Sequence, residues 1–116
     1  MNKPYNLEER AFVFARDVRD FVKTLNNSIS NIEDSKQLIK SSGSIGANYI
    51  EANESLGKKD FSFRLKISRK EAKESVFWLR LINDTNELRN KNMAEELIQE
   101  ATELKKILSA IIEKTK

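Results

Sequence analysis

The sequence predicts an all-α protein: an antiparallel, up-down-up-down four-helix bundle that forms a single domain over residues 1–116. Three observations predict this fold. The composition favours helix, with 34% charged residues and one proline. Apolar residues recur at three- and four-residue steps in four successive segments. The polar breaks between these segments are short, so successive helices should run antiparallel around one core.

The first helix is predicted over residues 7–25. Asn6 can cap its amino end, and Glu9 lies three residues on, where it completes a capping box. Polar residues 26–28 end the segment. One face of this helix is apolar and should enter the core: Leu7, Ala11, Phe14, Val18, Phe21 and Leu25.

The second helix is predicted over residues 31–56, with Ser30 as its cap and Gly57 as its stop signal. It contains Gly43 and Gly46, and a glycine inside a helix costs about 1 kcal/mol relative to alanine. We therefore expect close backbone contact along this segment. The residues predicted to face the core are Leu38, Ser42, Ile45, Tyr49, Ala52 and Leu56.

The third helix is predicted over residues 61–83 with Asp60 as its cap, and a polar loop follows it. Its core positions are Phe61, Leu65, Ser68, Ala72, Ser75, Leu79 and Ile82. Asn92, with Glu95 three residues later, should open a fourth helix over residues 93–114. The core positions of that helix are Ala94, Leu97, Ala101, Leu104, Leu108 and Ile111.

The composition argues against an enzyme. The chain has no histidine and no cysteine, so it lacks the commonest general base, the usual zinc ligands and a thiol nucleophile. We expect no catalytic residue, no metal site and no cofactor. No apolar run approaches the length of a membrane span, and the amino end does not resemble a secretion signal, so a cytoplasmic protein without a membrane partner is expected.

Two helices carry apolar or small residues beyond those that one core needs. Large exposed apolar patches usually mark association, and tryptophan is frequent at interface hot spots. We therefore predict an oligomer interface, with the alternative that these side chains only cover the flank of the bundle. The interface positions are Ile39, Gly43, Ala47, Ile50, Phe63, Ile67, Trp78 and Leu81.

A polar row follows another flank of the second helix: Ser41, Ser44, Asn48 and Glu51. Serine and asparagine are mediocre helix formers, so stability alone does not explain their choice. Hydrogen bonds from this row could fix the register between helices or subunits. The alternative is an ordinary solvated face.

A basic stripe lies along the third helix. Between residues 58 and 73 there are seven basic and two acidic residues. Six cations project from one side, within an arc of about 100°, and they define the basic stripe: Lys59, Lys66, Arg69, Lys70, Lys73 and Arg80. Clustered cations can bind the phosphates of structured RNA or DNA. The alternative is a solvated face that pairs with the acidic fourth helix.

Three segments of the sequence resemble a known family. The segment of residues 42–52, Ser-Gly-Ser-Ile-Gly-Ala-Asn-Tyr-Ile-Glu-Ala, is followed by Lys-Asp-Phe at 59–61 and Arg-Lys-Glu-Ala-Lys-Glu-Ser at 69–75. In combination they resemble the bacterial four-helix bundle proteins encoded in 23S rRNA intervening sequences, also called S23 ribosomal proteins. The similarity runs from about residue 7 to residue 112.

The resemblance implies a four-helix bundle that assembles into a homopentameric ring. It also implies distant kinship with the accessory variability determinant of diversity-generating retroelements, a basic pentamer that binds nucleic acid and a reverse transcriptase. The leading hypothesis is thus a non-catalytic homopentamer that binds the backbone of structured RNA or DNA through the basic stripe, with a reverse transcriptase-like protein as a further partner. The rival hypothesis is an oligomeric adaptor that binds only protein.

Overall fold

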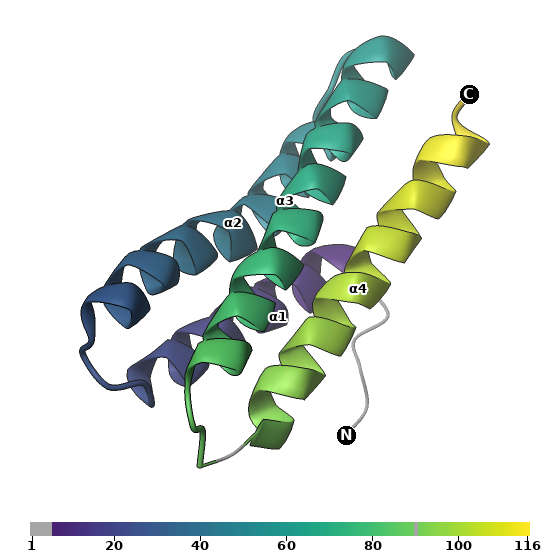
Figure 1. Cartoon of the computed structure of the whole chain (residues 1–116). Helices are drawn as coiled ribbons and strands as arrows, with labels where there is room; N and C mark the ends of the chain where they lie inside the picture. The colour runs from purple at the N-terminus through teal and green to yellow at the C-terminus, as the bar shows by residue number, and fades with distance from the viewer. Residues whose placement is uncertain (1–5, 90) are drawn as a thin grey trace.

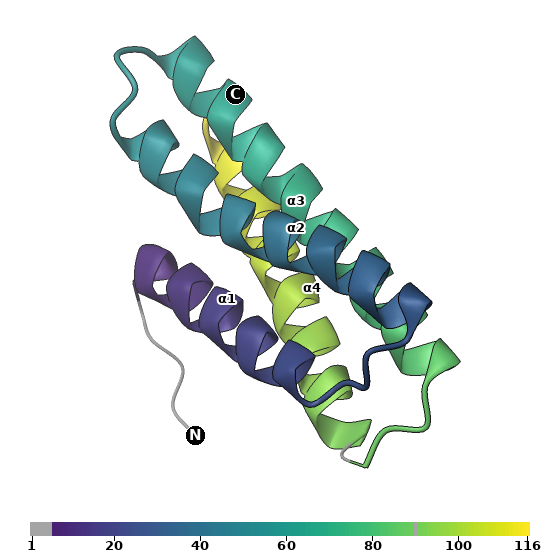
Figure 2. The ribbon, with the colours of Figure 1, turned by 90° about the vertical axis from the view of Figure 1, so that its left-hand side faces the viewer.

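The computed structural model describes residues 6–89 and 91–116, which form four α-helices. They are α1 (Leu7–Lys23), α2 (Ile29–Asn53), α3 (Lys58–Thr85) and α4 (Lys91–Lys114). Each helix packs against the next one in the chain, and α1 also packs against α4, which closes the bundle (Figure 1). The α1–α2 and α3–α4 connections lie at one end and the α2–α3 connection at the other (Figure 2). The predicted all-α, up-down-up-down bundle is confirmed.

The amino ends of the first two helices are capped by side chains. Asn6 Oδ1 accepts a hydrogen bond from the backbone N–H of Glu9 at 3.2 Å, so the predicted cap of α1 is confirmed. In α2 the cap is Ser28, whose Oγ accepts from the Asn31 N–H at 3.1 Å. The prediction of Ser30 as the cap was wrong. The helix starts two residues earlier than predicted, at Ile29, so the serine that precedes its first residue is Ser28.

The connection between α2 and α3 differs most from the prediction. Helix α2 ends at Asn53, where the N–H of Glu54 bonds to carbonyl groups of the preceding turn. Leu56 is therefore not a core residue, and its side chain is fully exposed. Gly57 does not stop α2; it is the N-cap residue of α3, with an extended backbone at φ −160°. Since α3 starts at Lys58, Asp60 lies in its first turn, where the helix dipole favours a carboxylate.

Smaller differences occur at three other helix ends. Helix α1 ends at Lys23, two residues before the predicted end, and α3 continues to Thr85, two residues beyond it. Helix α4 begins at Lys91, so Asn92 lies inside the helix and does not cap it. Residues of the capping types occur at several neighbouring positions here, so spacing alone does not select one.

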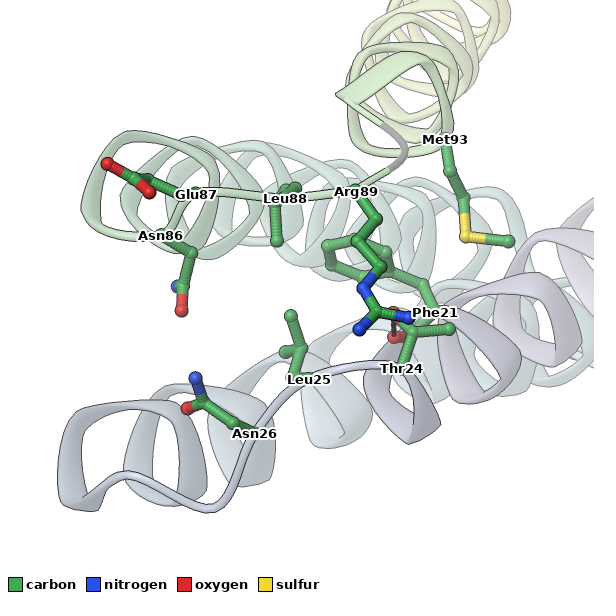
Figure 3. A pocket seen from close by; sticks show the side chains of 9 residues that line it. All are labelled: Phe21, Thr24, Leu25, Asn26, Asn86, Glu87, Leu88, Arg89 and Met93. Atoms are coloured by element: carbon green, nitrogen blue, oxygen red, sulfur yellow. Dashed lines mark hydrogen bonds between the residues drawn. The ribbon is translucent and has the colours of Figure 1, made fainter.

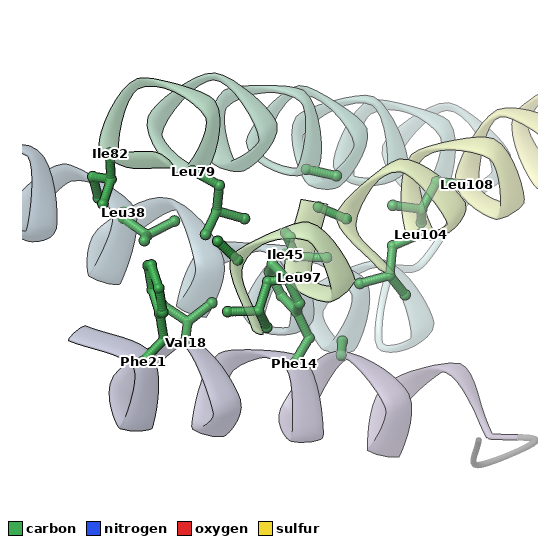
Figure 4. Close-up of a cluster of buried hydrophobic side chains, with 14 of the residues drawn as sticks. Phe14, Val18, Phe21, Leu38, Ile45, Leu79, Ile82, Leu97, Leu104 and Leu108 are labelled. Carbon is green, nitrogen blue, oxygen red and sulfur yellow. The ribbon is translucent and has the colours of Figure 1, made fainter. Parts of the chain in front are cut away.

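The core is made from the predicted apolar faces. All four helices contribute fully buried side chains, and those of Phe14, Ile45, Leu79 and Leu104 are each at most 1% exposed. These side chains point toward one another in the centre of the bundle (Figure 4). One position is corrected in α4, where Ile112 is buried and Ile111 is only partly buried. The final turn of α4 thus follows the 3.6-residue helical period, and a strict heptad would have chosen the wrong neighbour.

Serine hydroxyls connect α2 to α3 inside the core. Ser68 Oγ donates to the carbonyl oxygen of Ile45 at 2.7 Å, and the hydroxyls of Ser41 and Ser75 lie 2.9 Å apart. All three serines are at most 3% exposed. Small side chains let the two helices approach closely, and the hydrogen bonds satisfy the buried hydroxyls. Only one register of α2 on α3 satisfies both contacts.

Gly46 brings α2 close to α1. A Cβ atom at this position would lie 3.4 Å from the Cβ of Ala11 and 4.0 Å from its backbone carbonyl carbon. A larger side chain would push α1 outward. The close backbone contact expected of this segment is therefore made, at Gly46, within the chain itself.

Three asparagines tie the two connections at one end of the bundle together. The side-chain amide of Asn31 donates to the backbone oxygen of Asn26 at 3.1 Å and to its Oδ1 at 2.9 Å. Asn31 and Asn86 also exchange a reciprocal pair of amide hydrogen bonds, each 2.9 Å long. Asn31 is 2% exposed. This buried amide cluster fixes the α1–α2 connection against the end of α3.

Candidate nucleic-acid interface

The basic stripe lies on the outer side of α3, away from the core. Five of its six residues are exposed, and Arg69 is partly buried. A helix advances about 100° per residue, and on this basis the stripe is centred more than 120° from the buried face that contains Leu65 and Leu79. The packing of α3 against α2 and α4 therefore leaves the stripe accessible. The structure brings the six cations together along one helix, as the sequence predicts.

Carboxylates of the described residues do not neutralise this stripe. Within residues 6–89 and 91–116, none of the six cations forms an ion pair within 4 Å. Basic side chains outside the stripe do form ion pairs, for example Lys36 with Glu33. The cations on α3 thus keep their charge available for an external anion.

The fourth helix directs two of its acidic side chains toward α1. The guanidinium of Arg10 forms two hydrogen bonds to Glu100, Nε to Oε2 at 2.7 Å and Nη2 to Oε1 at 2.8 Å, and lies 3.7 Å from Glu103. The bond to Glu100 raises the pKa of Arg10 above its usual value. These contacts hold α1 against α4. Both carboxylates therefore face Arg10 and do not pair with the basic stripe.

Acidic residues of α3 also lie near the stripe, and Glu71 is the partly buried one beside Lys70. Burial raises the pKa of the Glu71 carboxyl, and the neighbouring Glu74 raises it further, while Lys70 and Lys40 act in the opposite direction. Glu71 is partly buried, and its carboxyl is close enough to Lys40 on α2 to feel the charge of that residue. Its charge therefore offsets the positive field near Lys70 only in part.

The polar row of α2 divides between two kinds of contact. Ser41 bonds to Ser75 across the helix interface, as described above. Ser44 and Asn48 instead donate to carbonyl oxygens one turn earlier in their own helix, those of Lys40 and Ser44. Glu51 is exposed. Within one protomer, Ser41 therefore helps to set the register of α2 on α3, and the other three residues of the row do not.

The predicted interface residues on α3 are only partly covered. Phe63 is 57% exposed, while Ile67, Trp78 and Leu81 are partly buried. Trp78 packs against the core and contacts Phe77 edge to face, with ring centroids 5.0 Å apart. By helical spacing, Ile67 and Trp78 share one strip, and Phe63 and Leu81 lie at the border between that strip and the basic stripe.

The predicted interface residues on α2 form a separate patch beside α1. Ile50 is 43% exposed, Ala47 is exposed, and Ile39 and Gly43 are partly buried. A Cβ atom at Gly43 would lie 3.4 Å from the guanidinium nitrogen Nη2 of Arg19 on α1. The serine contacts to α3 come from another side of α2. The chain therefore carries two distinct apolar patches, one on α2 and one on α3.

A hollow of about 630 Å³ lies at the end of the bundle near the amide cluster. Phe21 and Thr24 border it from α1 and its end, and Leu88 and Arg89 from the α3–α4 connection (Figure 3). Its other lining residues are Leu25, Asn26, Asn86, Glu87 and Met93. None of the predicted site residues lines it. The two connections come together only in three dimensions, and no spacing in the sequence indicates this hollow.

Among the residues that the structure describes, no group of three or more acidic, histidine or cysteine side chains is arranged to hold a metal ion. None of the described helices combines the length and apolarity needed to cross a membrane.

Comparisons with known proteins agree with the architecture. The family model of the 23S rRNA-intervening sequence protein matches residues 4–110. A crystal structure from Bacteroides thetaiotaomicron, of a protein with unknown function from the S23 ribosomal protein family, is 33% identical in sequence. The match covers 92% of this chain and 98% of that chain, with a TM-score of 0.82. No curated protein matches this chain.

Proposed function

This chain belongs to the 23S rRNA-intervening sequence protein family, and from that premise we propose a non-catalytic, homo-oligomeric bundle that binds the phosphate backbone of RNA or DNA. The binding surface is the basic stripe of α3. The family assignment supports the fold, and the character of the surface supports the ligand.

One observation carries the proposal: the six cations of the basic stripe are gathered on one helix face and are not paired with carboxylates of the described residues. Unpaired cations along one line attract a polyanion, because binding releases the counterions that the polyanion had condensed. The net charge of +3 adds little by itself. Contacts of this kind position a backbone and do not read bases, so weak sequence specificity is expected.

The test is a titration of a structured RNA hairpin at increasing salt. We expect retardation at low salt, with log K falling by about 0.7–0.9 for each phosphate contacted per tenfold rise in salt. Four to six contacts therefore predict a slope of roughly −3 to −5. Absence of binding at low salt, or binding that does not change with salt, would contradict the proposal.

Self-association would multiply this weak binding. The two apolar patches lie on different faces of the protomer, which suits a head-to-tail contact in which the strip of Ile67 and Trp78 on α3 of one copy meets the α2 patch of the next, while Phe63, at the border of that strip, stays exposed. Head-to-tail contacts close into rings when the rotation permits, and a homopentameric ring is the assembly we propose. Five basic stripes on one ring would bind one nucleic acid with avidity.

Substitutions at two glycines of α2 distinguish a loss of assembly from a loss of protomer stability. The Cβ of Gly43→Leu would lie 3.4 Å from the end of the long Arg19 side chain and within 4 Å of no backbone of another helix, so the protomer should stay helical while the oligomer dissociates. Gly46→Leu meets Ala11 on α1, and overpacking of this kind costs about 1–3 kcal/mol, so it should destabilise the protomer. Light scattering gives the mass and circular dichroism the unfolding transition. Gln37→Leu, exposed on another flank, is the control, and an unchanged mass for Gly43→Leu would refute this interface.

The second candidate function is an adaptor that binds only protein. The observation in its favour is the exposure of large apolar side chains, among them Ile50, Phe63 and Phe77. A partner such as a reverse transcriptase-like protein would then occupy the ring. Binding of a protein partner that survives loss of the basic stripe, in a chain that does not retard RNA, would favour this function.

A further inference from the structure

Two exposed phenylalanines accompany the basic stripe. Phe77 is 56% exposed and Phe63 is 57% exposed, although burial of such a ring would be favourable. Phe77 follows Lys73 by four residues and precedes Arg80 by three. Phe63 has the same spacing to Lys59 and Lys66. Residues three and four apart are neighbours on a helix surface, so each ring lies between two cations.

Both rings have a neighbour that restricts them. Trp78 meets Phe77 edge to face, at an interplanar angle of 84°, and is itself packed against the core. The guanidinium carbon of Arg64 lies 5.9 Å from the centre of the Phe63 ring, in the range of a cation–π contact. Rings restricted in this way lose less conformational entropy when a flat group stacks on them.

The spacing of the two rings suits an extended strand. They are 14 residues apart, which corresponds to about 21 Å along a helix. Lys66, Lys70 and Lys73 lie between them on the same side of α3. Cations that follow the phosphates, with aromatic rings on which bases stack, are the recurring elements of surfaces that bind single strands. The stacked bases inside a duplex are not available to such rings.

We propose that the basic stripe binds unpaired RNA or DNA, with bases stacked on Phe63 and Phe77 and phosphates along Lys66, Lys70 and Lys73. This inference rests on the proposed function and adds the class of ligand to it. It also gives the exposed rings a partner. A second copy of the chain would be a poor partner for Phe77, because covering that ring would also take the adjacent cations Lys73 and Arg80 out of water, which is costly.

The experiment compares three 15-nucleotide probes at equal salt: oligo(dT), an abasic strand of the same charge, and a duplex. Wild-type protein should bind oligo(dT) about tenfold or more tightly than the abasic strand, since stacking one base is worth about that factor. Binding of oligo(dT) should also change the fluorescence of Trp78, the single tryptophan of the chain, because its indole contacts Phe77.

The variant Phe63→Leu with Phe77→Leu should bind oligo(dT) only as well as the abasic strand, and its affinity for the abasic strand should equal that of wild type. The matched control is Phe12→Leu on α1, since Phe12 is 55% exposed and lies outside the stripe. It should behave as wild type. Circular dichroism should show all variants folded.

The outcomes separate this inference from the proposed function. Equal affinity of wild type for oligo(dT) and the abasic strand, or a double variant that loses nothing, overturns the inference and leaves phosphate binding intact. A double variant of lower mass with unchanged affinity for oligo(dT) also overturns it, because a second copy then covers the rings. No binding of any probe at low salt overturns the proposed function itself.

Discussion

Replacing Lys66, Arg69, Lys70 and Lys73 together with glutamate is expected to abolish the binding of RNA at low salt. A basic residue near an anionic surface contributes about 1 kcal/mol, and each glutamate adds a repulsion of similar size. The total loss is on the order of 4–8 kcal/mol, which is a factor of about a thousand or more in affinity. The four side chains lie on the outer side of α3, so the bundle should stay folded.

The measurement is the same hairpin titration. The control is a variant with the same change in net charge, in which the four substitutions lie outside the basic stripe. Each replacement alters the charge by two units, so the variant goes from +3 to −5. Glutamates at Arg16, Lys23, Lys36 and Lys114, all exposed and outside the stripe, produce the same net charge. If both variants lose binding equally, overall charge and not the stripe attracts RNA. Retained binding by the first variant would contradict the assignment of the surface.

Replacing Asn31 with alanine is expected to lower the free energy of unfolding by about 2–4 kcal/mol. The change removes all the hydrogen bonds that the Asn31 side chain makes in the amide cluster, to Asn26 and to Asn86. An unsatisfied buried polar group costs about 1–3 kcal/mol, and this cost falls on the partly buried Asn86, whereas the exposed Asn26 can bond to water instead. Asn86 retains its bond to the carbonyl oxygen of Ile82, which keeps the loss below the sum for two fully orphaned groups.

Urea unfolding followed by circular dichroism measures this effect. Asn27→Ala is the matched control, because Asn27 lies in the same connection but is exposed, and it should change the stability by less than about 0.5 kcal/mol. Asn31→Asp keeps the shape but lacks the amide donors, so it should be no more stable than the alanine variant. Equal stability of the Asn27 and Asn31 alanine variants would show that the buried amide cluster does not hold the two connections together.

The apolar periodicity predicted the architecture because it reports directly on burial. Phe14, Leu38, Leu79 and Leu104 were placed in the core from spacing alone, and each is at most 1% exposed. The cap at Asn6 was predicted for a similar reason: it depends on residues three apart in the chain. Such local rules need no knowledge of the neighbouring helix.

Prediction failed where several residues could serve the same local purpose. Gly57 was expected to stop α2, and it caps α3 instead. A glycine between two helices fits both positions, and the choice depends on how the whole α2–α3 turn packs. Ser28 and Ser30 presented the same ambiguity at the start of α2.

The sequence by itself determined the four helices, their apolar faces and the row of cations on α3, because each follows from the spacing of residues along one helix. The tertiary structure decided which polar side chains meet: Ser41 with Ser75, Arg10 with Glu100, and Asn31 with Asn86. It also decided that the carboxylates of Glu100 and Glu103 face α1, which leaves the basic stripe unpaired by them. The physical reason is that a helical period fixes directions around one axis, whereas a contact between helices depends on their register, crossing and rotation, which only the packed core sets.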